Sequence, residues 1–223
     1  MFRLTHFSDT HGSPFTTSIP ESSIAVVHSG DLLPNLTRGI REEEIPYQRE
    51  WLIANLPAVR RALGDRLFLF IRGNHDFMSA AEMEGLMRDA GIRATCLEPG
   101  PTNEVHTILG VRFYGFPYIP FIAGEWNFEA RSAEMSDRVS AIPECDILVA
   151  HCPPFGICAD VILGKGGGNA PLMNWLGYEC PKLPRWLLCG HMHDSHGIGM
   201  FHRDNEVMLV SNAATTVHTL EIS

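Results

Sequence analysis

The chain has 223 residues, of which 45% are hydrophobic and 19% are charged, and its formal net charge at pH 7 is −9. We expect one α/β domain over residues 1–223, because no break in composition divides the chain. The acidic balance argues against nucleic acid or an anionic membrane as a partner. In addition, no apolar run approaches the ~18 residues that a membrane-spanning helix needs.

Cysteine usage and the N-terminal segment indicate a cytoplasmic protein. The six cysteines show neither the paired spacing of a zinc site nor a dense disulfide framework, so we expect them to be reduced and buried. The first twelve residues, MFRLTHFSDTHG, lack the apolar core and the cleavage site of a signal peptide.

Short apolar runs alternate with helical patterns over the first hundred residues, which favours an α/β layered fold. The second helical pattern begins with Ser79 as a candidate N-cap and stops at Gly91. In the first, Pro57 is expected to split or kink the helix, because proline lacks the amide hydrogen and clashes with the preceding turn. Strands are expected at residues 2–8, 24–27 and 66–71, and helices at 41–64 and 79–91.

The second half predicts hairpins, a further helix and a long loop. One hairpin should turn at Gly110 and another at Asp204 and Asn205. Proline and glycine are dense over residues 153–185, which we interpret as a long irregular loop with one short helix. The other expected elements are an amphipathic helix at 125–139 and strands at 145–150, 185–189 and 216–222.

Polar side chains follow five of the predicted strands, at the point where each strand ends. They form the patterns D-x-H, G-D, G-N-H-D, a single histidine and G-H-x-H, in this order. Open α/β sheets bind ligands at the carboxyl ends of their strands, so these groups are expected to meet. Each fragment alone is more often a turn or a satisfied histidine, but all five in this order indicate a site. The residues are Asp9, His11, Asp31, Asn74, His75, Asp76, His151, His191 and His193.

Imidazoles, carboxylates and an amide oxygen suit borderline-to-hard divalent cations. This set predicts a two-metal site, in which one carboxylate bridges ions that lie ~3.5–4 Å apart and together hold a phosphoryl group. Asp31 stands alone at its strand end and is therefore the natural bridge.

In this combination the motifs resemble those of the calcineurin-like metallophosphoesterase superfamily, and they extend from Asp9 to His193. The resemblance implies a four-layer α/β/β/α sandwich of two mixed sheets flanked by helices, the metallo-dependent phosphatase-like fold. It also implies that His75 is no ligand but contacts the phosphate, as Asn74 does, and protonates the leaving group. One metal ion would be held by Asp9, His11, Asp31 and His193, and the other by Asp31, Asn74, His151 and His191.

Two longer segments, EWLIANLP and HCPPFGICADVILGKGGG, are similar to the small metallophosphoesterase-domain branch, which is itself similar to class III cyclic-nucleotide phosphodiesterases. The resemblance therefore implies a phosphodiesterase for a small, nucleotide-like phosphoester. A hydroxide that bridges the two ions would be the nucleophile. The cofactors implied are two divalent ions, manganese first, with iron, zinc or cobalt as alternatives.

Two other functions stay open. One is a phosphomonoesterase for a nucleotide or a phosphoprotein, and the other is a member that binds nucleotides without turnover. All seven ligand positions are filled, which argues against the second. Substrate specificity is expected to lie in residues 116–125 and 153–185.

One position departs from the family pattern. Relatives often carry an acidic residue three positions after the bridging aspartate, where it pairs with the catalytic histidine, but GDLLPN places Pro34 there. Proline can neither ionise nor accept a hydrogen bond through its side chain. The partner of His75 is therefore open, unless another carboxylate takes that place.

Other local patterns have simpler interpretations. GKGGGN, residues 164–169, lacks the hydroxyl residue after Lys165 that a phosphate-binding P-loop needs, so it is interpreted as a wall of the substrate cleft or a surface loop. Cys152 should point away from His151 and pack inside, because adjacent strand residues face opposite sides. His28 is expected to be a buried structural residue, whereas His196 is a candidate for lining the site.

Overall fold

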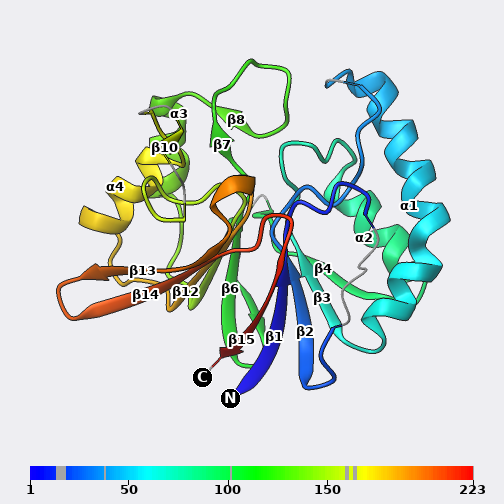
Figure 1. Cartoon of the computed structure of the whole chain (residues 1–223), viewed down its shortest axis with the longest axis horizontal. Coiled ribbons are helices and arrows are strands. Elements are labelled where there is room, and N and C mark those ends of the chain that lie inside the picture. The colour runs from blue at the N-terminus through cyan, green and yellow to red at the C-terminus, as the bar shows by residue number, and fades with distance from the viewer. Residues whose placement is uncertain (14–18, 38, 101, 159–160, 163–164, 223) are drawn as a thin grey trace.

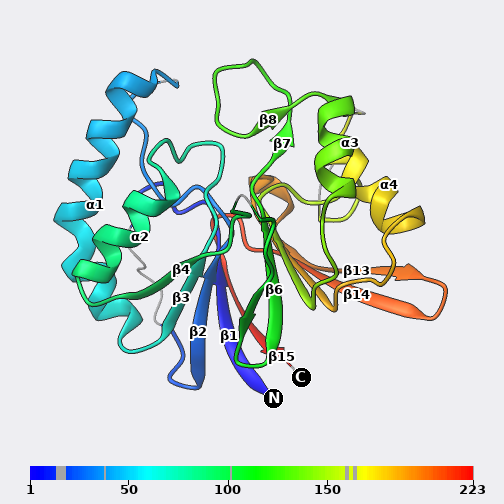
Figure 2. The same cartoon turned by 180° about the vertical axis from the view of Figure 1, so that it is seen from behind.

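The computed structural model shows four layers, with two β-sheets packed face to face and helices on both outer sides (Figure 1). Helices α1 and α2 cover one sheet, and α3 and α4 cover the other, as the view from behind also shows (Figure 2). The predicted α/β/β/α sandwich of two mixed sheets is therefore confirmed. The structure describes residues 1–13, 19–37, 39–100, 102–158, 161–162 and 165–222.

The first sheet has the strand order β15-β1-β2-β3-β4. Strands β1 to β4 are parallel, and β15 pairs antiparallel with β1, with Leu4 opposite Leu220. Parallel neighbours need a crossover, and here the crossovers include the helices that cover the sheet. The elements of this half are β1 (Phe2–Phe7), β2 (Ser23–His28), α1 (Arg41–Leu63), β3 (Leu67–Phe70), α2 (Ala80–Asp89), β4 (Arg93–Cys96) and β15 (Val217–Ile222).

The second sheet has the order β13-β14-β12-β9-β6-β5. Its four inner strands are parallel, and two hairpins add an antiparallel strand at each edge. The hairpins turn at Gly110 and at Asp204, both with positive φ, as predicted from the sequence. The elements are β5 (His106–Ile108), β6 (Val111–Phe116), α3 (Ser132–Ser140), β9 (Ile147–Ala150), α4 (Ala170–Tyr178), β12 (Trp186–Cys189), β13 (Gly197–Arg203) and β14 (Glu206–Asn212).

Apolar side chains fill the three spaces between the four layers. Between the two sheets, residues such as Leu69 and Ile71 meet Phe113 and Val149, all of which are buried. The helices pack on the outer faces through two further clusters, one around Phe68 and one outside the second sheet. Burial of this apolar surface is the main term that stabilises the fold.

Helix α1 differs from its prediction. It runs without interruption from Arg41 to Leu63 and contains both Pro46 and Pro57, so the expected split at Pro57 is wrong. The ring of Pro57 lies on the exposed side, where the carbonyl group that loses its partner can meet water. The buried stripe of the helix, on the other side, continues past this point with Leu56 and Val59.

The helix predicted at 125–139 begins only at Ser132. The preceding residues form β8 (Glu129–Ala130), which pairs in parallel with β7 (Ile119–Pro120). The side chain of Glu129 accepts hydrogen bonds from backbone N–H groups of residues 122–126, and this local arrangement replaces the first turns of the expected helix.

The segment 153–185 contains the one predicted helix, α4, which begins after the N-cap Asn169. It also contains two strands of two residues each, β10 (Val161–Ile162) and β11 (Lys165–Gly166). The interpretation of GKGGGN as a cleft wall falls partly on Gly164 and on the side chain of Lys165, which lie outside the described part of the chain. Among the described residues, no helix is both long and apolar enough to cross a lipid bilayer.

Candidate metal centre

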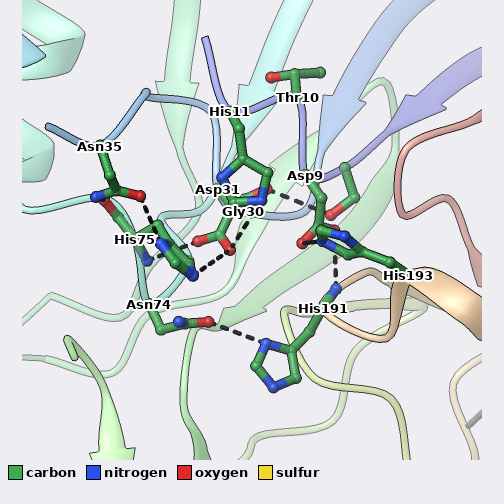
Figure 3. A network of polar contacts seen from close by, with 12 residues as sticks. Asp9, Thr10, His11, Gly30, Asp31, Asn35, Asn74, His75, His191 and His193 are labelled. Atoms are coloured by element: carbon green, nitrogen blue, oxygen red, sulfur yellow. Dashed lines mark hydrogen bonds and ion pairs between the residues drawn. The ribbon is translucent and has the colours of Figure 1, made fainter. Parts of the chain in front are cut away.

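The eight residues predicted as metal ligands or as the catalyst converge at the carboxyl ends of the strands of both sheets, and Figure 3 labels all of them except His151. They come from the segments that follow β1, β2, β3, β9 and β12. The two chain termini lie at the other end of these sheets (Figure 1). Four of the residues adopt left-handed backbone conformations, which cost of order 1–3 kcal/mol each and are typical of functional sites. They are Asp9, His11, Asp31 and His191.

Two of the motif glycines allow the strand ends to approach one another. A Cβ atom on Gly73 would collide with the carboxylate and backbone of Asp31, and one on Gly190 would collide with Ser8 and Asp9. The backbone N–H of His191 donates to Asp9 Oδ2 at 2.8 Å, and that of His75 donates to Asp31 Oδ1 at 2.8 Å. These bonds orient both carboxylates before any ligand arrives.

One side of the site offers carboxylate and imidazole ligands. The ligand atoms of Asp9, His11 and His193 all lie within 4.8 Å of one another. His193 Nε2 is 3.1 Å from Asp9 Oδ1, and His11 Nε2 is 3.8 Å from Asp31 Oδ2. Asp9, His11 and His193 can therefore share a single cation, and the sequence predicted Asp31 as a fourth ligand of the same ion. The ligand atoms of Asp31 also lie within 4.8 Å of those of Asp9 and His151, which form a second group.

The other side is built around Asn74. Its Oδ1 atom lies 3.0 Å from His151 Nε2 and 3.0 Å from His191 Nδ1. Ligand atoms that hold one ion at ~2.1 Å are ~3 Å apart when they stand at right angles, so the spacing fits a shared ion. Asp31 Oδ2 is 3.4 Å from His151 Nε2 and 3.8 Å from His11 Nε2, which places its carboxylate between the two groups.

The surroundings of His151 show that this side fits a cation. Its Nδ1 lies 2.9 Å from the carbonyl oxygen of Ser29, which only accepts, so Nδ1 carries the proton and donates. In a neutral imidazole, Nε2 then presents a lone pair to two acceptor oxygens, those of Asn74 and Asp31. Converging lone pairs in a fully buried position repel unless a cation, either a proton or a metal ion, lies among them.

The protonation states of the candidate ligands differ from one another. Burial lowers the pKa of His151, but the charge and hydrogen bond of Asp31 outweigh it and raise this pKa to about 9. Burial would raise the pKa of Asp31, yet the surrounding imidazoles, His151 foremost, hold it well below its usual value. Burial lowers the pKa of His191 to about 4, so this side chain is neutral and ready to act as a ligand at pH 7.

His75 stands beside these groups and makes different contacts. Its Nδ1 donates to Asn35 Oδ1 at 2.5 Å, while its Nε2 lies 4.0 Å from Asp31 Oδ2 (Figure 3). The ring also packs against Trp126, with 4.2 Å between the centroids. Burial lowers the pKa of His75. The partner of its Nδ1 is thus the neutral amide of Asn35, one residue after Pro34, where the family pattern suggests a carboxylate.

Sequence reasoning missed the residues that hold the loops of the site in place. Gln48 of α1 is fully buried, and its amide group donates to the carbonyls of Pro34 and His75 and accepts from the N–H groups of Phe77 and Met78. It continues the stripe of Leu52 and Leu56 at helical spacing, and this is the signal that would have marked it as buried.

Two further buried residues act in the same way, and one of them, Asp76, is the last residue of the predicted G-N-H-D pattern. The carboxylate of Asp76 accepts from the N–H groups of Leu32, Leu33 and Gly73, which joins the loops after β2 and β3. The amide of Asn212 donates to the carbonyls of Met192 and Ser195 and so supports the G-H-x-H turn.

As expected, Cys152 and His28 are buried, and Thr10 Oγ1 lies 3.0 Å from His28 Nε2. His196 is exposed, and its Nδ1 lies 3.1 Å from the carbonyl oxygen of His193.

Comparison with solved structures shows the fold alone. One crystal structure superposes with a TM-score of 0.61 at 13% identity, and the match covers 95% of this chain and 90% of that chain. The crystal structure of TT1561 of Thermus thermophilus gives a TM-score of 0.50 at 11% identity, covering 98% and 97% of the two chains. No family model matches the sequence.

The resemblance to calcineurin-like metallophosphoesterases found in the sequence is confirmed by named relatives. The named relatives are metallophosphoesterase domain-containing protein 1 of Homo sapiens and of Mus musculus. Each is 27% identical to this chain over 86% of its length. The chain spans 60% of the length of these curated relatives.

Proposed function

We propose that the chain is a phosphoester hydrolase that uses two divalent metal ions, and that phosphodiesters are its preferred substrates. The observation that carries this proposal is the arrangement around Asp31, where one buried carboxylate lies between two groups of ligand atoms. The named relatives support a metal-dependent phosphoesterase. A small, nucleotide-like phosphoester is the proposed partner.

Each ion is held by four side chains in this proposal, and the two sets share Asp31. Two bound ions would activate a water molecule as the nucleophile and stabilise negative charge on the phosphoryl group. Manganese is the first candidate, with iron, zinc and cobalt as alternatives for the same ligand types. Asp9, His11, Asp31 and His193 would hold one ion, and Asp31, Asn74, His151 and His191 the other.

His75 is proposed as the general acid. Asn35 fixes the tautomer that has its proton on Nδ1, and Nε2 is left facing the site. Once Nε2 takes up a proton from solvent, the resulting imidazolium can give that proton to the departing oxygen and so return to the neutral tautomer. Asn74, whose oxygen would be a metal ligand, is proposed to contact the substrate as well.

The charges that line the pocket favour a diester. Two divalent cations, two carboxylates and one hydroxide leave a single net positive charge, which matches the single negative charge of a phosphodiester. Among the described side chains that line the pocket there is no lysine or arginine to balance a second charge, and Asp194 adds a negative one. A dianionic monoester is therefore the less suitable substrate.

A screen with chromogenic esters tests the proposal. Bis(4-nitrophenyl) phosphate and 4-nitrophenyl phosphate are supplied with Mn²⁺, before and after chelation and after addition of each candidate metal. We expect metal-dependent turnover that is faster for the diester and is lost in Asp31→Ala. Faster turnover of the monoester would instead make the chain a phosphomonoesterase. A metal-loaded protein that cleaves neither ester would overturn hydrolysis and leave a binding protein.

A further inference from the structure

One wall of the pocket above the candidate metal centre is apolar. The pocket has a volume of about 360 Å³, and Ile122, Trp126 and Met192 line it beside the candidate ligands and His75. Ile122 is 55% exposed, although isoleucine is among the residues that are most often buried. Neither a metal ion nor a phosphoryl group requires an apolar neighbour, so the proposed hydrolysis leaves this wall without a role.

The wall belongs to a segment with a defined shape. Ile122 and Trp126 lie in the connection between β7 and β8, which rises above the strand ends (Figure 2). The carboxylate of Glu129 accepts from the backbone N–H groups of Ile122, Gly124 and Trp126 at 3.3, 2.6 and 3.3 Å. One side chain thus joins the backbone of residues 122–126.

The end of this segment is attached to the G-N-H-D turn. The backbone N–H of Asn127 donates to the carbonyl of Asn74 at 3.1 Å, and its side-chain amide donates to the carbonyl of Asp76 at 2.5 Å. Trp126 is the residue before this anchor, and its ring lies 4.2 Å from that of His75 at an angle of 43°. The indole is therefore held at a fixed place next to the position proposed for the phosphoryl group.

We propose that Trp126 and Ile122 bind a flat aromatic group that is esterified to the substrate phosphate, such as an aryl or nucleobase-bearing ester group. This inference rests on the proposed function and narrows its substrate class. An aromatic ring can stack on an indole and at the same time cover the exposed side chain of Ile122. Asp194, which lines the same pocket, disfavours a substrate with a second phosphate group.

A binding experiment separates this wall from the hydrolysis itself. Methyl(phenyl)phosphinate and dimethylphosphinate carry the single negative charge of a phosphodiester, and neither can be hydrolysed at its carbon–phosphorus bonds. Their affinities for the Mn²⁺-loaded protein are measured by calorimetry. We expect methyl(phenyl)phosphinate to bind about tenfold more tightly, the advantage that stacking and burial of one ring provide. Trp126→Ala and Ile122→Ala should each reduce this ratio toward one, and Trp126→Phe should retain most of it.

The controls separate recognition from packing. Ile53, which is 50% exposed on α1 and lines a different pocket, provides the matched variant Ile53→Ala, which should leave the ratio unchanged. If Trp126 only supports His75, its removal will weaken the binding of both phosphinates equally, and Ile122→Ala will have no effect. That result overturns the inference, as does a ratio of one in the unmodified protein or a failure of both phosphinates to bind. The proposed hydrolysis fails on a different result, the absence of turnover in the ester screen.

Discussion

The imidazole of His75 donates a hydrogen bond from Nδ1 to the side-chain oxygen of Asn35, with 2.5 Å between the two atoms. Where family members often carry a carboxylate, this chain thus presents a neutral amide, supplied one position later than the family pattern would suggest. An amide orients the ring as well as a carboxylate does, but it does not stabilise the charged imidazolium to the same degree. Burial lowers the pKa of His75 further, so the side chain is mainly neutral at pH 7 before substrate binds.

Asn35→Asp should therefore make His75 a stronger base. A carboxylate at hydrogen-bond distance raises the pKa of a histidine by about one to three units. Because the general acid must be protonated, the alkaline limb of the kcat profile should move to higher pH by about one unit or more. The measurement is the pH dependence of diester hydrolysis. Asn55→Asp, which adds the same charge on α1, serves as the control, and an equal shift in both variants would contradict the assignment of Asn35.

His75→Ala distinguishes a proton donor from a mere phosphate contact. A general acid matters most for a basic leaving oxygen and little for a nitrophenolate, whereas a hydrogen bond to a non-bridging oxygen helps both substrates alike. We expect the variant to slow a nucleoside diester ~10²–10⁴-fold more than it slows a nitrophenyl diester. Metal analysis should find the ions retained, since His75 is not part of either ligand group. Equal losses on both substrates would show that His75 only binds the phosphate.

Gln48→Leu should destabilise the fold and disturb the site together. The substitution leaves two backbone carbonyls and two N–H groups without their partner in a buried position. The loss should be about 2 kcal/mol in the free energy of unfolding, measured with urea on the metal-free protein. Asn55→Leu on the same helix is the control, because among the described residues the amide of Asn55 bonds to the Trp51 carbonyl one turn earlier and joins no second loop. A Gln48 variant as stable as this control would show that the loops after β2 and β3 keep their conformation without the hydrogen bonds of Gln48.

The sequence indicates which strand ends meet at the candidate site where its signals are local. Asp9 and His11, or His191 and His193, lie two positions apart directly after an apolar run, so both the pattern and the strand end can be recognised in a few residues. The parallel strands then bring these short patterns to one edge. The hairpins were predictable for the same reason, because the turn at Asp204 and Asn205 lies between two strands that pair with each other.

Residues whose partners lie far along the chain were not predictable. Asn35 reaches His75 across 40 positions, and Gln48 reaches it across 27. Glu129 accepts from residues of a segment that the polar pattern had suggested was helical. Helix α1 passes through Pro57 because its buried stripe, and not its local propensity, determines its course. Such contacts depend on the packing of whole elements, which a pattern in one stretch of sequence does not contain.

The last prediction concerns proton release when metal binds. The pKa of His151 is about 9 without metal, so at pH 7 a proton occupies the Nε2 position that an ion would take. Raising the pH removes this competitor, and the apparent affinity for the ion beside Asn74 should rise about tenfold per pH unit until it levels off near pH ~9. His191, whose pKa is about 4, is neutral throughout this window and contributes no proton.

Calorimetry in two buffers of different ionisation enthalpy measures this release directly. At pH 7 we expect the ion held by Asn74, His151 and His191 to displace about one proton from His151. His202→Asn removes an exposed histidine on β13 and should leave the release unchanged. Binding heats that do not depend on the buffer, together with an affinity that is flat between pH ~7 and ~9, would show that His151 is already neutral. In that case Nε2 of His151 would carry no proton, although the oxygens of Asn74 and Asp31 lie close to it.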